Sequence, residues 1–242
     1  VPKGKIRLIK RIMKIPSQAE LFKTLKNNDL LKVLTEKELK LVEENIKFIP
    51  YKKGETIYKQ GNRIADITVN MVGLVKTFIE NKSHDRNTIV AMQLPVTIIG
   101  STTLYDDVYK ATAEAMSDCV IAFVDIKLVQ ELARENSKFM EGLYKRTCVK
   151  MNTFMRQIAD LGQKQIRARM ATVLLIIAEK KEKNYIDIHI SRNELSEYAG
   201  ISTGSAIRLL SDLEKEGIIK LDKKNIDIVN RKKLEEISQV DD

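Results

Sequence analysis

The side chains most often used for catalysis or metal binding are scarce in this chain. Its 242 residues include two cysteines, Cys119 and Cys148, and two histidines, His84 and His189. Two cysteines cannot form a four-cysteine zinc or iron–sulfur site, and neither histidine follows or precedes a candidate nucleophile in a catalytic pattern. The patterns GxxxxGK[ST] and HExxH do not occur. The residue types therefore predict no enzyme and no metal or cofactor site.

Residues 190–217, ISRNELSEYAGISTGSAIRLLSDLEKEG, have the spacing of two short helices joined by a tight turn. Ser191 and Glu194 form a capping box for the first helix, and Ser202 can cap the second. Gly200 supplies the turn between them. Apolar residues are spaced so that the two helices share one interior; these are Leu195, Ala199, Ile201, Ile207 and Leu210. The pattern predicts a helix-turn-helix, a motif that presents hydrogen-bonding side chains to the major groove of DNA.

A predicted hairpin, or wing, follows this motif. Ile218–Leu221 and Ile226–Val229 are apolar runs on either side of the polar turn Asp222–Asn225. The alternative is an ordinary helical hairpin without a role in DNA binding. The turn sequence Ala-Gly-Ile-Ser combined with a wing favours the DNA-binding interpretation.

The elements that must position this motif lie upstream. Residues 18–46 predict two short helices, Gln18–Asn27 and Thr35–Asn45. Between Ile46 and Val124 short β-rich runs alternate with glycine-containing turns, which is typical of a barrel or roll. The runs are Ile46–Tyr51, Thr56–Tyr58, Ile67–Met71, Leu74–Glu80, Thr88–Gln93 and Val120–Asp125.

A helical segment follows the β-rich region. Apolar positions alternate at spacings of four and three over about three heptads, which predicts dimerisation through the helix Ser137–Leu161. The alternative is a helix that packs this stripe on its own domain. Gly162 interrupts the pattern before a second helix, Ile166–Lys180, so we expect a domain boundary near Gly162–Gln165. The seam positions are Met140, Tyr144, Thr147, Met151, Phe154, Ile158 and Leu161.

The composition, with 43% hydrophobic and 31% charged residues, allows a packed core. No apolar run is long enough to span a bilayer, and residues 1–14 lack the apolar region of a secretory signal, so we expect a cytoplasmic protein without a membrane partner. The net charge of +9 arises mainly in residues 1–53, which carry 14 Lys+Arg against 6 Asp+Glu. Because a charge run is usually a solvated face, this excess does not by itself predict nucleic-acid binding.

Taken in order, these segments resemble the Crp/Fnr-type bacterial transcription regulators over roughly Lys23 to Lys233. The resemblance implies an α+β protein with a double-stranded, jelly-roll-like β-roll as a cyclic-nucleotide-binding-like sensor domain (18–135). A dimerisation helix (136–162) and a winged helix-turn-helix domain (163–242) follow. The matching residues are Lys53-Gly54-Glu55-Thr56-Ile57, Gln60-Gly61, Ile99-Gly100, Ala111, Ala115, Arg169-Met170-Ala171, Leu174-Leu175, Ala178 and Ile190–Leu210.

The resemblance implies a homodimer that regulates transcription from a two-fold-symmetric operator on double-stranded DNA, with RNA polymerase as a further partner. Arg208 matches an arginine that contacts a base in the family, although an ion pair with Asp212 is an alternative. Thr203 and Gly204 depart from the arginine and glutamate common there, so the family's operator sequence is not transferred. The residues expected to face DNA are Ser202, Thr203, Gly204, Ser205 and Arg208.

The resemblance also places an effector pocket in the roll. The family's cassette, Gly-Glu followed by Arg-Ser-Ala, binds the ribose hydroxyl and the cyclic phosphate. Here serine replaces the glutamate and tyrosine the arginine, and a lysine offers only a point charge. We therefore expect an empty, apolar or plugged pocket, an unknown effector and no response to cAMP. The corresponding residues are Gly100, Ser101, Tyr109, Lys110 and Ala111 in the roll and Phe154 and Met155 on the long helix.

A second class of function stays open on the sequence alone. The chain could be a regulatory or scaffold protein that uses the roll and the helical seam for protein contacts. A specific, salt-sensitive gel shift on operator DNA would distinguish the two.

Overall fold

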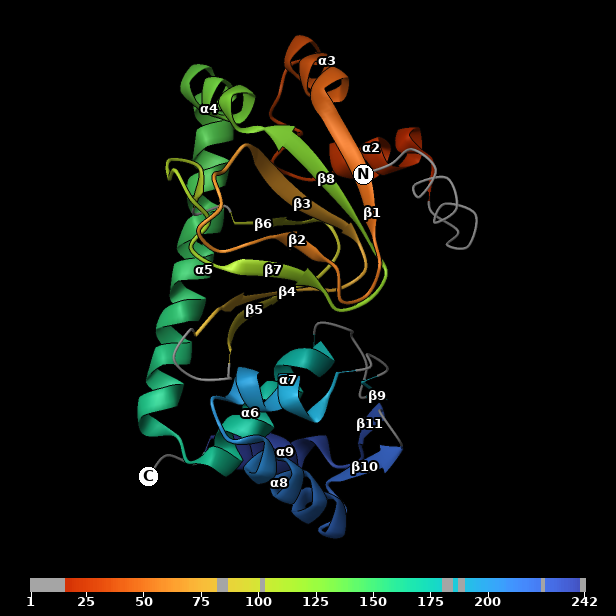
Figure 1. Ribbon diagram of the computed structural model, residues 1–242, viewed down its shortest axis with the longest axis vertical. Helices are drawn as coiled ribbons and strands as arrows, with labels where there is room; N and C mark the ends of the chain where they lie inside the picture. The colour runs from red at the N-terminus through yellow and green to blue at the C-terminus, as the bar shows by residue number, and fades with distance from the viewer. Residues whose placement is uncertain are drawn as a thin grey trace. The chain divides into compact units, whose positions relative to one another are not determined.

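The computed structural model describes residues 16–81, 87–100, 103–179, 185–186, 190–222 and 225–239 (Figure 1). These residues form two compact units. The first contains the described residues up to Ile79 together with Met92–Met151, and the second contains those of Glu80–Ala91 and those from Asn152 onward. Within the described ranges, no helix has both the length and the apolar character needed to cross a membrane.

Two four-stranded antiparallel sheets, ordered β1-β8-β3-β6 and β2-β7-β4-β5, make up the β-roll (Figure 1). Register is set by apolar pairs such as Ile49 opposite Ile121. The predicted α+β roll is confirmed, and its three-residue strand β2 was predicted, but the similarly short strands β6 and β7 were not. The strands are β1 (Ile46–Tyr51), β2 (Thr56–Tyr58), β3 (Asp66–Val72), β4 (Val75–Ile79), β5 (Thr88–Gln93), β6 (Thr97–Ile99), β7 (Thr112–Ala115) and β8 (Cys119–Asp125).

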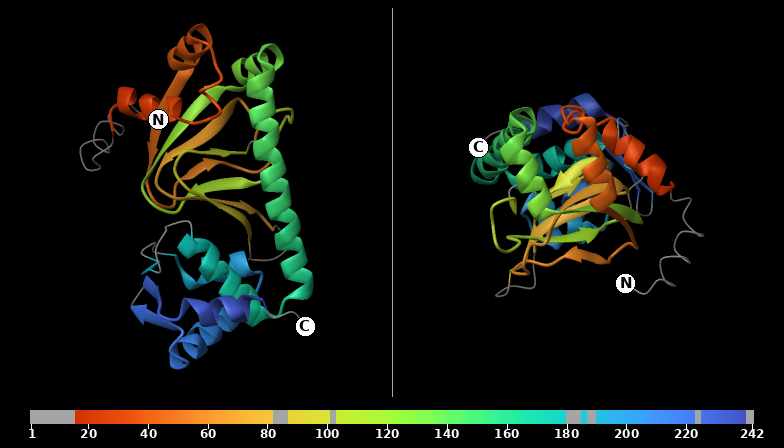
Figure 2. Two further views of the ribbon diagram at one scale, coloured as in Figure 1. Left: turned by 180° about the vertical axis from the view of Figure 1, so that it is seen from behind. Right: turned by 90° about the horizontal axis from the view of Figure 1, so that it is seen from above.

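Helices cover the β1-β8-β3-β6 sheet on its outer face (Figure 2). Capping boxes start two of these helices: Ser17 with Glu20 starts the first, and Thr35 with Glu38 starts the second. The apolar faces of these helices and of the sheet share one core, while a second core lies between the two sheets. The helices are α2 (Gln18–Lys26), α3 (Glu36–Asn45), α4 (Ile126–Glu135) and the first turns of α5 (Ser137–Gln163).

The long helix α5 runs unbroken for 27 residues. Gly162 was expected to end the apolar pattern of this helix; the helix itself continues through Gly162 to Gln163, and α6 begins at Ile166. Glycine inside a helix costs only about 1 kcal/mol relative to alanine, which one position near a helix end tolerates.

The second unit contains the helix-turn-helix and a small antiparallel sheet of order β10-β11-β9. The predicted wing is confirmed as the pair β10–β11, in which Ile219 lies opposite Ile228; residues 223–224 of its turn lie outside the described residues. The last helix was not predicted. The elements are α6 (Ile166–Glu179), β9 (Tyr185–Ile186), α7 (Arg192–Ala199), α8 (Thr203–Lys215), β10 (Ile219–Asp222), β11 (Asn225–Ile228) and α9 (Arg231–Ser238).

Candidate nucleic-acid interface

The turn between α7 and α8 depends on a glycine for two reasons. Gly200 has φ +64° and ψ +36°, a left-handed conformation that side chains with a Cβ rarely adopt. A Cβ at this position would also lie 2.7 Å from Cδ2 of Leu161, near the end of α5. Ile201 follows the glycine and is buried. The last turns of α5 and the helix-turn-helix are therefore closely fitted to each other.

The interior shared by α7 and α8 differs from the prediction at one position. Leu195, Ala199 and Leu210 are buried as expected, but the side chain of Ile207 is 53% exposed. Ala206 and Leu213 instead join Leu210 on the buried face of α8. Ile207 lies one residue beyond Ala206, a rotation of about 100° around the helix, so it turns away from this interior.

Two of the predicted DNA-facing positions, Arg208 and Gly204, make no side-chain interaction with the rest of the described protein. Arg208 is exposed, and within the part of the chain that the structure describes it forms no ion pair or hydrogen bond. Among the described residues the alternative ion pair with Asp212 is not formed; the Asp212 carboxylate lies 3.6 Å from Lys215 Nζ. A Cβ built on Gly204 would meet no atom within 4 Å, so this face of α8 is open.

The three hydroxyl residues at the start of α8 are hydrogen-bonded within the motif. Ser202 Oγ accepts from the Ser205 amide at 3.0 Å, and it donates to Ser205 Oγ at 2.8 Å. Thr203 Oγ1 donates to Asn193 Oδ1 at 3.1 Å, which turns this hydroxyl toward α7. The first role of these residues is thus to start α8 and to hold it against α7.

Two tyrosines fill the interior of the roll beside Gly100. The rings of Tyr58 and Tyr109 stack with centroids 3.9 Å apart and planes inclined by 9°. The Tyr109 hydroxyl donates to the Asp66 carbonyl at 3.1 Å, and burial raises the pKa of Tyr109 to about 12. A Cβ on Gly100 would lie 3.3 Å from the Tyr58 hydroxyl oxygen. The part of the predicted effector pocket beside Gly100 is therefore occupied by aromatic side chains.

The apolar stripe of α5 is uncovered along most of its length. Five of its seven positions are exposed, with Ile158 the most exposed at 69%, and the other two, Thr147 and Phe154, are half-buried. Exposed apolar surface in a continuous band usually marks an association site. The exposed positions are Met140, Tyr144, Met151, Ile158 and Leu161.

Two family models match this chain in the order of its units. Residues 48–136 match the cyclic nucleotide-binding domain, and residues 168–237 match the Crp-like helix-turn-helix domain. The chain belongs to the Crp/Fnr family. It is a DNA-binding transcription regulator and not an enzyme, and the match to a Crp-like DNA-binding domain argues against the scaffold alternative.

Relatives of this Crp/Fnr regulator are distant in sequence and similar in fold. It is 24% identical over 201 residues to the transcriptional activator protein FnrL of Cereibacter sphaeroides, covering 79% of this chain and 80% of FnrL. The structure of FixK2 from Bradyrhizobium japonicum matches with a TM-score of 0.74 and 22% identity, covering 81% of this chain and 98% of FixK2. A crp/fnr-family regulator from Eubacterium rectale also gives a TM-score of 0.74, at 18% identity over 88% of this chain and 99% of that protein.

The turn of the helix-turn-helix in this Crp/Fnr regulator also matches a catalytic sequence pattern. Residues 200–204, Gly-Ile-Ser-Thr-Gly, match the hydrolase pattern GxSxG. That pattern requires a strand before the turn so that the serine is held in a strained, exposed position. Here the helix α7 precedes the turn, and Ser202 is an ordinary helix N-cap with φ −68°. The match therefore carries no catalytic meaning.

The remaining residues of the predicted effector pocket differ in how far their side chains are exposed. Lys110 is exposed, and its Nζ lies 3.7 Å from the Asp106 carboxylate. Ala111 is half-buried, Phe154 is half-buried on α5, and Met155 is exposed there. Ser101 lies outside the described residues.

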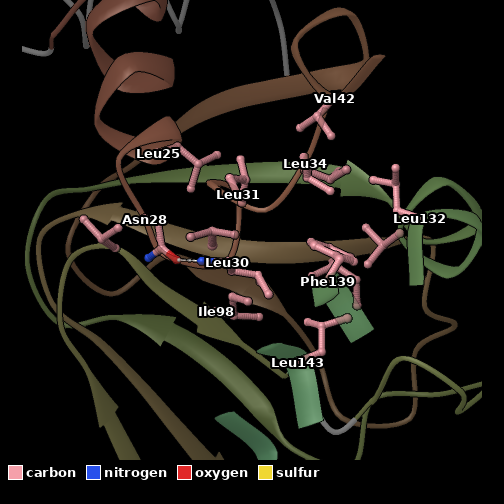
Figure 3. A pocket seen from close by; sticks show the side chains of 15 residues that line it. Leu25, Asn28, Leu30, Leu31, Leu34, Val42, Ile98, Leu132, Phe139 and Leu143 are labelled. Atoms are coloured by element: carbon pink, nitrogen blue, oxygen red, sulfur yellow. Dashed lines mark hydrogen bonds between the residues drawn. The ribbon is translucent and has the colours of Figure 1, made fainter. Parts of the chain in front are cut away.

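A cavity of about 50 Å³ lies in the first unit, on the helix-covered side of the β1-β8-β3-β6 sheet (Figure 3). Its lining is aliphatic and aromatic except for Asn28, which accepts a hydrogen bond from Arg146 Nη2 at 2.6 Å. Its apolar walls offer no partner for a phosphate. Labelled side chains around it include Leu25, Leu30, Leu31, Leu34, Val42, Ile98, Leu132, Phe139 and Leu143.

Proposed function

We propose that this regulator binds a two-fold-symmetric operator as a homodimer joined through α5. The observation that carries the proposal is the uncovered apolar stripe from Met140 to Leu161. Burial of apolar surface drives association, and a seven-residue repeat brings the same positions of two copies together. Two recognition helices related by two-fold symmetry would meet half-sites about 10–11 base pairs apart, centre to centre.

In this proposal, the start of α8 enters the major groove. The free guanidinium of Arg208 can donate two hydrogen bonds to guanine O6 and N7. Gly204 lets the helix approach the bases closely, and the N-terminus of α8, with Ser202, Thr203 and Ser205, faces a DNA phosphate. In this proposal sensing belongs to residues 18–135, dimerisation to residues 136–162 and DNA binding to residues 163–242.

The roll would not act as a cyclic-nucleotide sensor. Tyr58 and Tyr109 occupy its interior, and the exposed Lys110 pairs with Asp106. A contact with RNA polymerase and a cytoplasmic location complete the proposal, which leaves the effector unknown; membership of a family of transcription regulators supports both.

Selection of DNA sites from a random-sequence pool tests this function. The full-length protein should enrich an inverted repeat, and its gel shift on that repeat should weaken steeply as salt increases, because Lys and Arg contacts release counterions from DNA. Sedimentation of the complex should give two protein chains per operator. Enrichment of no sequence at all would contradict the proposal.

A further inference from the structure

Ile207 is an apolar side chain on the exposed face of the recognition helix. The buried face of α8 is formed by Ala206, Leu210 and Leu213, at helical spacings of four and three. Ile207 lies outside this face, and more than half of its side chain is exposed. Isoleucine is among the residue types most often buried, so its exposure on a helix that has a well-filled interior needs an explanation.

The surroundings of Ile207 leave it accessible to a large partner. One turn before it stands Gly204, where a Cβ would meet no atom within 4 Å. Side chains on an α-helix lean toward the helix N-terminus, so Ile207 extends over the turn that contains this glycine. The helix surface beside Ile207, toward the start of α8, is therefore free of side chains.

The residue next to Ile207 supplies the polar half of the same surface. Arg208 is exposed and, within the described ranges, has no ion pair or hydrogen bond. Adjacent positions on one exposed helix face thus offer a free guanidinium and a branched aliphatic group. The only apolar group that a base pair presents in the major groove is the C5-methyl of thymine.

We propose that Ile207 reads the C5-methyl group of a thymine in the base pair next to the one that Arg208 contacts. The proposal rests on DNA binding through α8, as proposed above. It predicts that removal of the methyl group of one thymine in each half-site is enough to weaken binding of the operator. Burial of one methyl group corresponds to about 0.8 kcal/mol, which is a factor of about four in affinity for each half-site.

Deoxyuridine substitution tests this directly, because it removes the methyl group and leaves every hydrogen-bonding group in place. Each thymine of the selected operator is replaced in turn, in both half-sites together, and the dissociation constant of the full-length protein is measured by fluorescence anisotropy. We expect a loss of about 15-fold at one symmetric pair of thymines, the product of two fourfold losses. No loss at any thymine would overturn the proposal.

Two variants test whether Ile207 is the residue that contacts this methyl group. Ile207→Ala should bind the thymine and deoxyuridine operators equally, and it should fold normally because the side chain is exposed. Val229→Ala removes another exposed aliphatic group, 62% accessible, from the same unit and should retain the full discrimination. Discrimination that persists in Ile207→Ala assigns the thymine to another residue and overturns the proposal. If the wild-type protein selects no operator, the proposed function itself fails, an outcome distinct from deoxyuridine tolerance on a selected site.

Discussion

Tyr109 stacks on Tyr58 with ring centroids 3.9 Å apart, inside the roll and beside Gly100. Stacked aromatic pairs of this kind contribute about 0.5–1.5 kcal/mol beyond the burial of their area. The Tyr109 hydroxyl is also satisfied by the Asp66 carbonyl. A ligand that enters this space has to separate the two rings. Its polar groups also need hydrogen-bond partners there.

Cyclic nucleotides should therefore neither bind tightly nor change DNA binding. Ser101 and Tyr109 stand where the family's cassette carries its glutamate and its arginine, and an unpaired phosphate in an apolar interior is very costly. Titration calorimetry with cAMP and cGMP up to millimolar concentration should give no binding heat, and the operator gel shift should be unchanged by either nucleotide. Micromolar binding together with a stronger gel shift would refute this prediction, since a ligand can act only through its differential affinity for two states.

Met151→Glu combined with Ile158→Glu should dissociate the dimer. Both residues belong to the exposed stripe and stand one heptad apart, so the variant places like charges opposite each other across the seam. Sedimentation velocity should change from dimer to monomer. The matched control is Asn152→Glu with Ala159→Glu, which adds the same charges one residue further along, away from the seam. A dimer that survives the first pair of substitutions would show that α5 is not the interface.

Arg208→Ala should reduce operator affinity by about 1–3 kcal/mol and relax the preference at one base pair in each half-site. The comparison is a set of operators with single base-pair changes, each measured with wild-type protein and with the variant. Lys215→Ala, which changes another exposed cation of α8, should not relax any base preference. A uniform loss across all operators for Arg208→Ala would instead assign Arg208 to the DNA backbone.

Val42→Ile should stabilise the first unit by about 0.5–1 kcal/mol. Val42 lines the 50 Å³ cavity, and an added methylene fills part of a space whose presence costs about 24 cal/mol for each Å³. Urea denaturation at fixed protein concentration measures the change. Val149→Ile adds the same methylene at an exposed position of α5 and should leave the unfolding free energy within about 0.5 kcal/mol of wild type.

Lys150 should make the stability rise with pH above 8. Its Nζ donates to the Ile98 carbonyl at 2.7 Å, and burial, with a smaller contribution from the nearby positive charge of Arg146, lowers the pKa of Lys150 to about 8. Because the unfolded chain keeps a lysine pKa of about 10.4, it binds more protons than the native state between these two values. The unfolding free energy should therefore increase with pH in this window.

The measurement compares wild type with Lys150→Met at pH 7 and pH 9.5. The wild-type unfolding free energy should gain about 1–2 kcal/mol relative to the variant over this interval. Other groups that titrate in this range cancel in the comparison. Equal pH dependence of the two proteins would show that Lys150 keeps its ordinary pKa.

The sequence by itself determined the order of the elements and most of the elements themselves; β6, β7 and α9 are the exceptions. The capping box at Ser191 and the turn at Gly200 were predicted correctly, because each depends on hydrogen bonds or backbone angles within a few residues. The seven-residue repeat of α5 is likewise local. The helix-turn-helix, its wing and the roll followed from these patterns.

Only the tertiary structure decided which side of each element is covered. Ile207 has the periodicity of a core position, yet Ala206 faces α7 and Ile207 does not. Thr203 lies where a DNA contact was expected, but its hydroxyl donates a hydrogen bond to Asn193 Oδ1. Tyr109 lies in the segment expected to bind an effector, and it pairs with Tyr58, 51 positions earlier in the chain. Periodicity specifies the faces of a helix or strand, whereas burial depends on the partner that distant parts of the chain bring to each face.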